Sequence, residues 1–184
     1  MSKKREDILI AAGKLFNKYG FVNVGVDRII SESQVAKMTF YKHFPSKDNL
    51  MEECLIERDK LFREGVLRSI SISEIDGLSK LKSIFDWYSE WFEQEEFFGC
   101  MFIKASDELL PDSALEQIIV EHKDWLLETI QSTLSTMGVK DDELIARQIR
   151  LFLDGAIINE RVFKDGKAIS DAWLAVLKIL DLQQ

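Results

Sequence analysis

The chain has 184 residues, a formal net charge of −8 and 46% hydrophobic residues. Such a length and apolar content support one domain, or two small ones, with a sizeable core. The sequence has no apolar run long enough to cross a membrane and no signal peptide, and its two cysteines form no CxxC pair of the kind that binds metals. We therefore expect a cytoplasmic protein with no metal site and no cofactor.

The charge is unevenly distributed along the chain. Residues 1–50 contain nine Lys and Arg against five Asp and Glu, a net charge of +4, so the remaining residues carry −12. A basic N-terminal module on an acidic body suggests that only the first part of the chain meets a polyanion. Ordinary surface charge is the alternative that this asymmetry alone leaves open.

Apolar residues recur with helical spacing along the whole chain. The first such stripe runs from Ile8 to Tyr19 and is followed by Gly20, a residue favoured at helix C-termini. Pro45 is expected to end a later helix, and Ser46 to cap the next one. No segment has the pattern of a strand, so we predict an all-α fold. The predicted helices cover residues 8–19, 26–33, 36–42, 47–71, 78–95, 100–110, 115–137, 145–160 and 170–180, the last with Ser170 as its cap.

The two short helices over 26–44 have the length and spacing of a helix-turn-helix. In that motif the second helix enters the major groove of DNA, and neighbouring residues contact phosphates. Phe40 and Phe44 are expected to face the small core. An exposed helical corner with solvated lysines is the alternative. Side chains that supply positive charge or hydrogen-bond donors to DNA are Lys37, Thr39, Tyr41, Lys42, His43 and Lys47.

Residues 8–50 resemble the DNA-binding segment of the tetracycline-repressor (TetR) family of bacterial transcription regulators. The stretch reads "ILIAAGKLFNKYGFVNVGVDRIISESQVAKMTFYKHFPSKDNL", and the marks of the family include Gly20, Thr39, Phe40, Tyr41 and Ser46. The resemblance implies a helix-turn-helix domain at 1–48, and an effector-binding and dimerisation domain at 49–184. It also implies a homodimer that represses transcription from a palindromic operator and releases it when a small molecule binds.

The resemblance also assigns roles by position. Lys37, Met38, Thr39 and Tyr41 fall on the recognition helix, whereas Lys42, His43 and Lys47 fall where phosphate contacts are usual. Four positions depart from the family pattern. Gln34 replaces a turn glycine, Ala36 replaces a capping Ser or Thr, Met38 replaces a small residue, and Gly25 replaces a Thr or Ser. These departures leave the motif intact. The resemblance therefore does not imply which bases this chain prefers.

Aromatic residues are concentrated over 85–102. We expect some of them to line an apolar cavity for a small hydrophobic or aromatic effector, although a plain core is the alternative. Asp107, Glu108 and the acidic residues near them leave a cationic ligand open, although solvated carboxylates are the simpler interpretation. The two cysteines are interpreted as buried small hydrophobes, with a redox-sensing thiol as the alternative. The expected ligand-binding residues are Trp87, Tyr88, Trp91, Phe102 and Phe152.

Long apolar stripes over 115–137 and 142–163 predict a dimer interface built as an intermolecular four-helix bundle. The Gly155–Ala156 pair permits close approach of two helices there. Trp125, Ile130 and Ile157 are the residues expected to be buried against a second copy.

Two rival functions remain to be weighed. An enzyme is disfavoured because the sequence has no HExxH, no glycine-rich phosphate loop and no GxSxG, and only two histidines. A helical adaptor that binds another protein through residues 115–160 is the second rival. The adaptor predicts no affinity for nucleic acid, so a DNA-binding assay separates it from the regulator.

Overall fold

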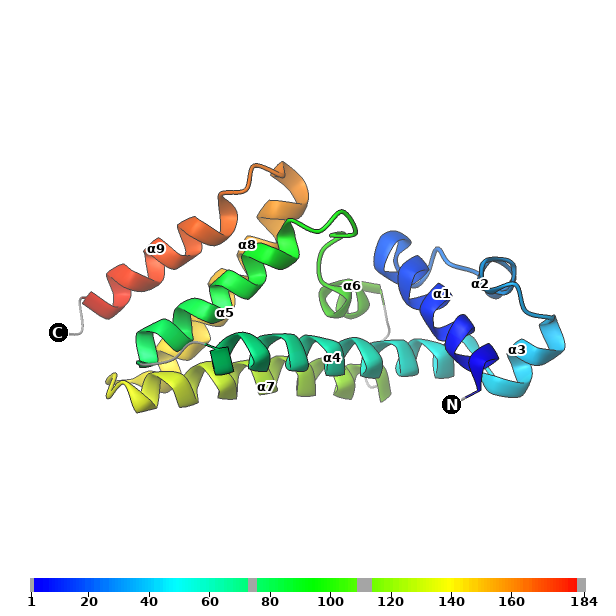
Figure 1. Cartoon of the computed structure of the whole chain (residues 1–184), viewed down its shortest axis with the longest axis horizontal. Coiled ribbons are helices and arrows are strands. Elements are labelled where there is room, and N and C mark those ends of the chain that lie inside the picture. Colours follow the sequence, from blue (N-terminus) through cyan, green and yellow to red (C-terminus); the bar gives the residue numbers. More distant parts are fainter. Residues whose placement is uncertain (1, 73–75, 109–113, 182–184) are drawn as a thin grey trace. The chain divides into compact units, whose positions relative to one another are not determined.

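Helices make up all the secondary structure of residues 2–72, 76–108 and 114–181, which are the residues that the computed structural model describes. The all-α prediction is confirmed. Figure 1 shows the helices in chain order. They are α1 (Lys3–Tyr19), α2 (Val26–Ser33), α3 (Lys37–His43), α4 (Lys47–Ile72), α5 (Gly77–Phe92), α6 (Met101–Glu108), α7 (Ala114–Thr136), α8 (Asp142–Phe163) and α9 (Ala168–Asp181).

The chain forms two compact units, each built from two separate segments. One unit, called here the head unit, consists of Met1–Leu61 and Cys100–His122. The other, the body unit, consists of Phe62–Gly99 and Lys123–Gln184. Helices α4 and α7 therefore contribute residues to both units. The predicted boundary after residue 48 stays a prediction, since the contacts place residues 100–122 together with the helix-turn-helix.

The first helix of the head unit has well-defined ends. Ser2 accepts a hydrogen bond from the backbone N–H of Arg5 through its side-chain oxygen (3.3 Å), and this bond caps the N-terminus of α1. At the other end Gly20 adopts a φ of +82°, which an L side chain rarely adopts, and its N–H donates to the carbonyl of Phe16. The glycine stop expected from the sequence is confirmed.

The turn between α2 and α3 takes the left-handed conformation without a glycine. Gln34 has a φ of +53°, and its backbone N–H reaches the carbonyls of Ile30 and Ser31. Ala36 precedes α3 with the extended backbone of an N-cap but offers no side-chain hydrogen bond. The motif therefore folds despite two residues that are poorly suited to these positions.

Two further helix starts were predicted from serines, and the structure bears out one of them. Ser46 accepts a hydrogen bond from the backbone N–H of Asn49 (3.0 Å), as expected at the start of α4. The cap predicted at Ser170 is wrong, because α9 begins at Ala168. Ser170 lies in the first turn and donates to the carbonyl of Lys167 (2.8 Å), while the backbone N–H of Asp171 also donates to that carbonyl.

The core of the body unit contains a cluster of aromatic rings. Phe62 of α4 contacts Trp87 of α5 edge to face, with 4.8 Å between ring centroids. A Cβ atom on Gly65 would come within 2.4 Å of the Trp87 ring nitrogen, so the absence of a side chain there lets α5 lie close to α4. Phe85 packs on Trp173 of α9 at 5.0 Å, and α9 in turn packs along α8 (Figure 1). These contacts join the four helices into one core.

Replacing Gln34 with glycine should stabilise the protein. The left-handed backbone costs a non-glycine residue about 1 kcal/mol, and Gln34→Gly removes that cost without touching the core. We expect the free energy of unfolding, measured by urea titration, to rise by about 0.5–1 kcal/mol. Gln34→Ala is the matched control, because it removes the same side chain and keeps the Cβ atom. An equal gain from both variants would contradict the backbone explanation.

Candidate nucleic-acid interface

One side of helix α3 is buried in the head unit, and the other side exposes both polar and apolar side chains. Phe40 and Phe44 are completely buried, and their ring centroids lie 6.2 Å apart. On the outer side, Met38 is 82% exposed and Tyr41 is 43% exposed. These two side chains are therefore open to a partner, beside the exposed Lys37 and Lys42. The inner rings thus fix the orientation in which the outer side chains meet a partner.

All seven residues predicted to contact DNA belong to the head unit. Lys37, Met38, Tyr41 and Lys42 are exposed, whereas Thr39, His43 and Lys47 are half-buried. His43 approaches the side chain of Ser2 (Nε2 to Oγ, 3.3 Å), so the chain start and the end of α3 are linked. The structure therefore brings these seven together on and beside one short helix, and their role in binding stays a prediction.

One of the predicted cations is paired within the motif. The ammonium of Lys37 lies 3.3 Å from the carboxylate of Asp27 on α2. Both side chains are well exposed, and an exposed pair of this kind stabilises a protein by less than about 1 kcal/mol. Lys37 can therefore exchange Asp27 for a base or a phosphate at little cost.

A second group of cations lies where α1 ends and α2 begins. The guanidinium of Arg28 lies over the ring of Tyr19 at 4.0 Å, and the ammonium of Lys18 lies 5.3 Å from the same ring. Hydrogen bonds from Arg28 and then from Lys18 lower the pKa of Tyr19. Sequence analysis did not single out Arg28, because nine residues separate it from Tyr19 and only folding brings the two together.

Helix α6 is bonded to the corner between α1 and α2. One carboxylate oxygen of Glu108 accepts hydrogen bonds from the backbone N–H groups of Phe21 and Val22, each at 2.7 Å. Lys104, one turn earlier on α6, donates to the backbone carbonyl of Asn17. A Cβ atom on Gly20 would lie only 2.2 Å from the Glu108 carboxylate. Glycine is therefore favoured at this position both by the positive φ and by the close approach of Glu108. Glu108 was expected to be solvated, and that expectation is wrong.

A buried histidine contact joins three other helices of the head unit. His122 on α7 is 2% exposed, and its Nδ1 atom lies 2.7 Å from the carboxylate of Asp59 on α4. Its ring stacks on Phe102 of α6, with 3.6 Å between centroids.

On α4, burial raises the pKa of the Cys54 thiol to about 12. Cys54 is therefore the protonated thiol at neutral pH, which disfavours a redox-sensing role for it.

Four of the five aromatic residues predicted to bind an effector are packed against other rings, and the fifth, Phe152, is half-buried on α8. Tyr88 and Trp91 are 1% and 6% exposed, and both contact Phe62. Phe102 stacks on His122 instead. None of the five predicted residues lines either of the two pockets that the structure describes. An effector site among these rings stays a prediction, and their ring-to-ring packing weighs against it.

Two of the three residues predicted at the dimer interface are buried inside their own chain. Ile130 is completely buried and Ile157 is 3% exposed, so neither has surface left for a second copy. Trp125 is half-buried against Phe62 (6.2 Å) and beneath the guanidinium of Arg63 (5.1 Å). A dimer would have to use mainly other side chains.

Two kinds of site were sought across the described residues. Among them, no group of three or more His, Cys, Asp or Glu side chains is placed to hold a metal ion. In the same residues, no helix has the length and apolar character needed to span a membrane.

Removing the Glu108 carboxylate should destabilise the head unit. In Glu108→Ala the backbone N–H of the buried Phe21 loses its acceptor, and an unsatisfied buried donor costs about 1–3 kcal/mol, whereas water can replace the acceptor at the exposed Val22. We expect a drop of that size in the free energy of unfolding, with a smaller drop for Glu108→Gln, which retains an acceptor oxygen. The exposed neighbour Asp107→Ala is the control and should change stability little. Equal stability of the two alanine variants would show that the hydrogen bonds contribute nothing.

Comparison with known proteins identifies the head unit. Residues 8–54 match the family described as bacterial regulatory proteins, tetR family. An HTH-type transcriptional regulator from Lactococcus lactis subsp. lactis is 28% identical over 171 residues, which cover 88% of this chain and 85% of that protein. A TetR-family transcriptional regulator from Streptomyces coelicolor superposes with a TM-score of 0.89 at 25% identity, over 96% of this chain and 95% of its own. A TetR-type regulator from Streptomyces avermitilis superposes at 0.82 with 26% identity, over 98% and 99% of the two chains. Residues 8–54 thus carry the DNA-binding helix-turn-helix of the tetR family, and over most of its length the chain is similar to TetR-type transcriptional regulators, which are not enzymes.

Proposed function

We propose that the chain is a cytoplasmic homodimeric repressor that binds a palindromic operator in duplex DNA and releases it when a small molecule binds the body unit. The observation that carries the proposal is the outer face of α3, where Lys37, Met38 and Tyr41 are exposed on a helix anchored by buried Phe40 and Phe44. Because residues 1–50 carry a net charge of +4 and the remainder of the chain carries −12, DNA would be attracted to the helix-turn-helix segment.

In this proposal the residues of α3 divide into two groups. Lys37, Met38 and Thr39 would meet base edges, with the exposed thioether of Met38 suited to a thymine methyl group. Tyr41, Lys42, His43 and Lys47 would meet phosphates, which position the helix without reading sequence. A helix of seven residues reads only a few base pairs, so a specific site requires two copies and two half-sites about one helical turn or more apart.

The proposed dimer interface uses α8 and α9. Four large apolar residues of α8 lie on one exposed stripe: Leu144 (47%), Leu151 (65%), Ile158 (52%) and Val162 (65%). Together with half-buried Gln148 and Gly155, they follow the alternating spacing of four and three residues that forms a helix–helix seam. A Cβ atom on Gly155 would meet nothing within 4 Å, so a second helix has room to approach there. On α9 the exposed Leu174 (54%) adds to this surface.

Helix α7 is less suited to the interface than the sequence suggested. In the part of α7 that belongs to the body unit, the exposed positions include Asp124, Glu128, Ser132 and Ser135, all of them polar. The apolar residues that gave α7 its stripe, such as Ile130, face the core of their own chain. We therefore replace the predicted pairing of α7 and α8 by a pairing of α8 and α9 with the same helices of a second copy.

Release of DNA requires only that the effector prefers one arrangement of the two head units. An effector that binds more tightly to a dimer whose heads are wrongly spaced for the groove shifts the population toward that dimer. A preference of about 3 kcal/mol would lower operator affinity on the order of a hundredfold. Helices α4 and α7 are the elements through which such a preference would act, since both contribute to the two units.

Binding to DNA can be tested with the promoter fragment upstream of the protein's own gene. Fluorescence anisotropy should show a preference for that duplex over random DNA at physiological salt. Lys47→Ala should weaken binding to all sequences and reduce the salt slope by about 1, because one phosphate contact is lost. Met38→Ala should instead change which base is preferred.

The control for Lys47→Ala is Lys140→Ala, which removes the same charge from the body unit and should leave the salt slope unchanged. A wild-type protein with no preference for any promoter fragment would favour the adaptor over the repressor.

The dimer can be tested with one charged substitution on each candidate helix. Leu151→Glu places a carboxylate in the proposed α8 seam and should weaken dimerisation a hundredfold or more, roughly 3 kcal/mol, because the charge is buried without a partner. Val120→Glu makes the same kind of change at a 50% exposed position of α7 and should leave the dimer intact. Sedimentation velocity measures both. A dimer that survives Leu151→Glu but not Val120→Glu would return the interface to α7.

A further inference from the structure

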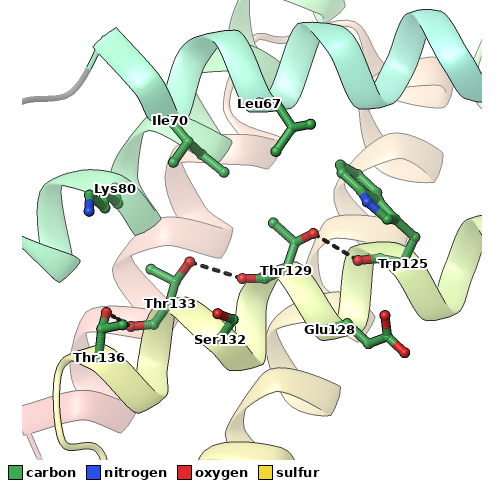
Figure 2. Close-up of a pocket in the computed structure, with 9 residues that line it drawn as sticks. All are labelled: Leu67, Ile70, Lys80, Trp125, Glu128, Thr129, Ser132, Thr133 and Thr136. Atoms are coloured by element: carbon green, nitrogen blue, oxygen red, sulfur yellow. Dashed lines mark hydrogen bonds between the residues drawn. The ribbon is translucent and has the colours of Figure 1, made fainter.

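A groove in the body unit lies among α4, α5 and α7. Its volume is about 410 Å³, which falls within the range of small-molecule sites. Figure 2 shows the residues that line it, with Leu67 and Ile70 on the α4 side and Trp125 below them on α7. Leu67 is 50% exposed, which leaves apolar surface for a ligand. This wall offers a binding surface to the flat or apolar part of a small molecule.

A row of hydroxyl groups follows Trp125 along the face of α7 that lines the groove. Thr129, Ser132, Thr133 and Thr136 line it at intervals of three, one and three residues, which places them on the same side of the helix (Figure 2). The three threonines each donate to a carbonyl one turn earlier, at 2.8, 2.9 and 2.7 Å. Their oxygens keep lone pairs, so this row accepts hydrogen bonds from a ligand.

One cation marks the end of the groove near the start of α5. Lys80 lines the groove, and together with Thr136 it also lines an adjoining pocket of about 580 Å³. A Cβ atom on Gly77 would come within 2.0 Å of the Met137 side chain, so this glycine is what lets the first turn of α5 approach the end of α7. The close approach places the lysine beside the hydroxyl row. Asp76 caps α5 through the backbone N–H of Ser79 (2.7 Å), and this bond lowers the pKa of Asp76.

Glu128 is the one carboxylate among the residues lining the groove, and it competes with Lys80 in deciding the charge of a ligand. It is exposed on α7, one residue before Thr129. Lys80 also serves the adjoining pocket, whereas Glu128 lines only the first. Asp76 also lines the adjoining pocket, but its Oδ1 atom already accepts the N–H of Ser79, and Lys80 is the one cation among the residues that line the two pockets. A ligand with its anionic group at Lys80 leaves its neutral end for the acceptor groups of α7.

We propose that this groove binds a small amphipathic organic acid, with its anionic group at Lys80, its apolar body against Leu67, Ile70 and Trp125, and its hydrogen-bond donors toward the hydroxyl row. The proposal rests on the proposed function in taking this ligand as the effector. It narrows the small hydrophobic or aromatic effector expected from the aromatic residues to an acid, and places it in this groove in place of the aromatic cluster. An ammonium and hydroxyls at one end of an apolar wall are complementary to such a molecule.

Three probes that share a naphthalene ring and differ in charge test the effect of charge on binding. They are 2-naphthoate, its neutral amide 2-naphthamide, and the cation 2-naphthylmethylammonium. Calorimetry should show 2-naphthoate binding about tenfold more tightly than the amide, the size of effect that one charge-assisted hydrogen bond gives. Lys80→Gln should remove that difference and leave the affinity for the amide unchanged. Lys82→Gln is the matched control, because Lys82 lies on the same helix, pairs with Asp86 and does not line the groove.

Fluorescence locates the bound probe. Quenching by 2-naphthoate should be lost in Trp125→Phe and retained in Trp173→Phe, since Trp125 lines the groove and Trp173 packs on Phe85. The proposal is overturned if the cation binds more tightly than the acid, if Lys80→Gln leaves the preference for the acid in place, or if the quenching survives in Trp125→Phe.

Operator binding is measured separately, so that the two proposals can fail independently. If 2-naphthoate binds through Lys80 and leaves operator affinity unchanged, the groove and its ligand class are supported while effector control is not. If operator affinity falls in step with occupancy of the groove, both proposals are supported. A groove that rejects the acid overturns the ligand class even when the protein binds its operator specifically.

Discussion

The stability of helix α3 depends on the burial of two phenylalanines. A helix of seven residues makes too few internal hydrogen bonds to persist alone in water, so α3 is stable only because Phe40 and Phe44 are buried in the head unit. Burial of these rings also decides which side chains face outward. Met38 is exposed because Phe40 lies on the opposite side of the same helix, whereas Tyr41 stands beside Phe40, with 5.2 Å between their ring centroids, and is 43% exposed. The core contact and the recognition surface are two consequences of one packing arrangement.

Close approaches at three glycines shape the rest of the molecule. Gly20 leaves room for the Glu108 carboxylate, Gly65 for the ring of Trp87, and Gly77 for the side chain of Met137. In each case a methyl group would come within 2.4 Å of the partner, a distance that no packed side chain tolerates. The first contact fastens α6 within the head unit, the second closes the aromatic core, and the third forms one end of the groove. Both units therefore depend on glycines that leave room for a neighbouring side chain.

The surface of the chain separates three kinds of chemistry. Cations and hydroxyls are concentrated on α3 and beside it, while α8 exposes a stripe of large aliphatic residues, and the groove of the body unit combines one apolar wall with one row of hydroxyls. A polyanion, a second copy of the chain and a small amphipathic molecule each suit one of these surfaces. A regulator that responds to a ligand needs all three, and each is built from helices that also form the core.

The sequence by itself determined the local structure, because helix caps, turns and apolar periodicity depend on residues close together in the chain. It predicted the helix-turn-helix, the stop at Gly20, the cap at Ser46 and the inward position of Phe40 and Phe44. Only the tertiary structure decided which face of each helix stays open. The apolar periodicity of α7 and α8 predicted buried faces but not their partners, so Ile130 and Ile157 are buried in their own chain while Leu151 is left exposed. The hydrogen bond from the backbone N–H of Phe21 to Glu108 and the contact of Arg28 with the ring of Tyr19 join residues 87 and nine positions apart. Such contacts depend on how the helices pack, which no local pattern encodes.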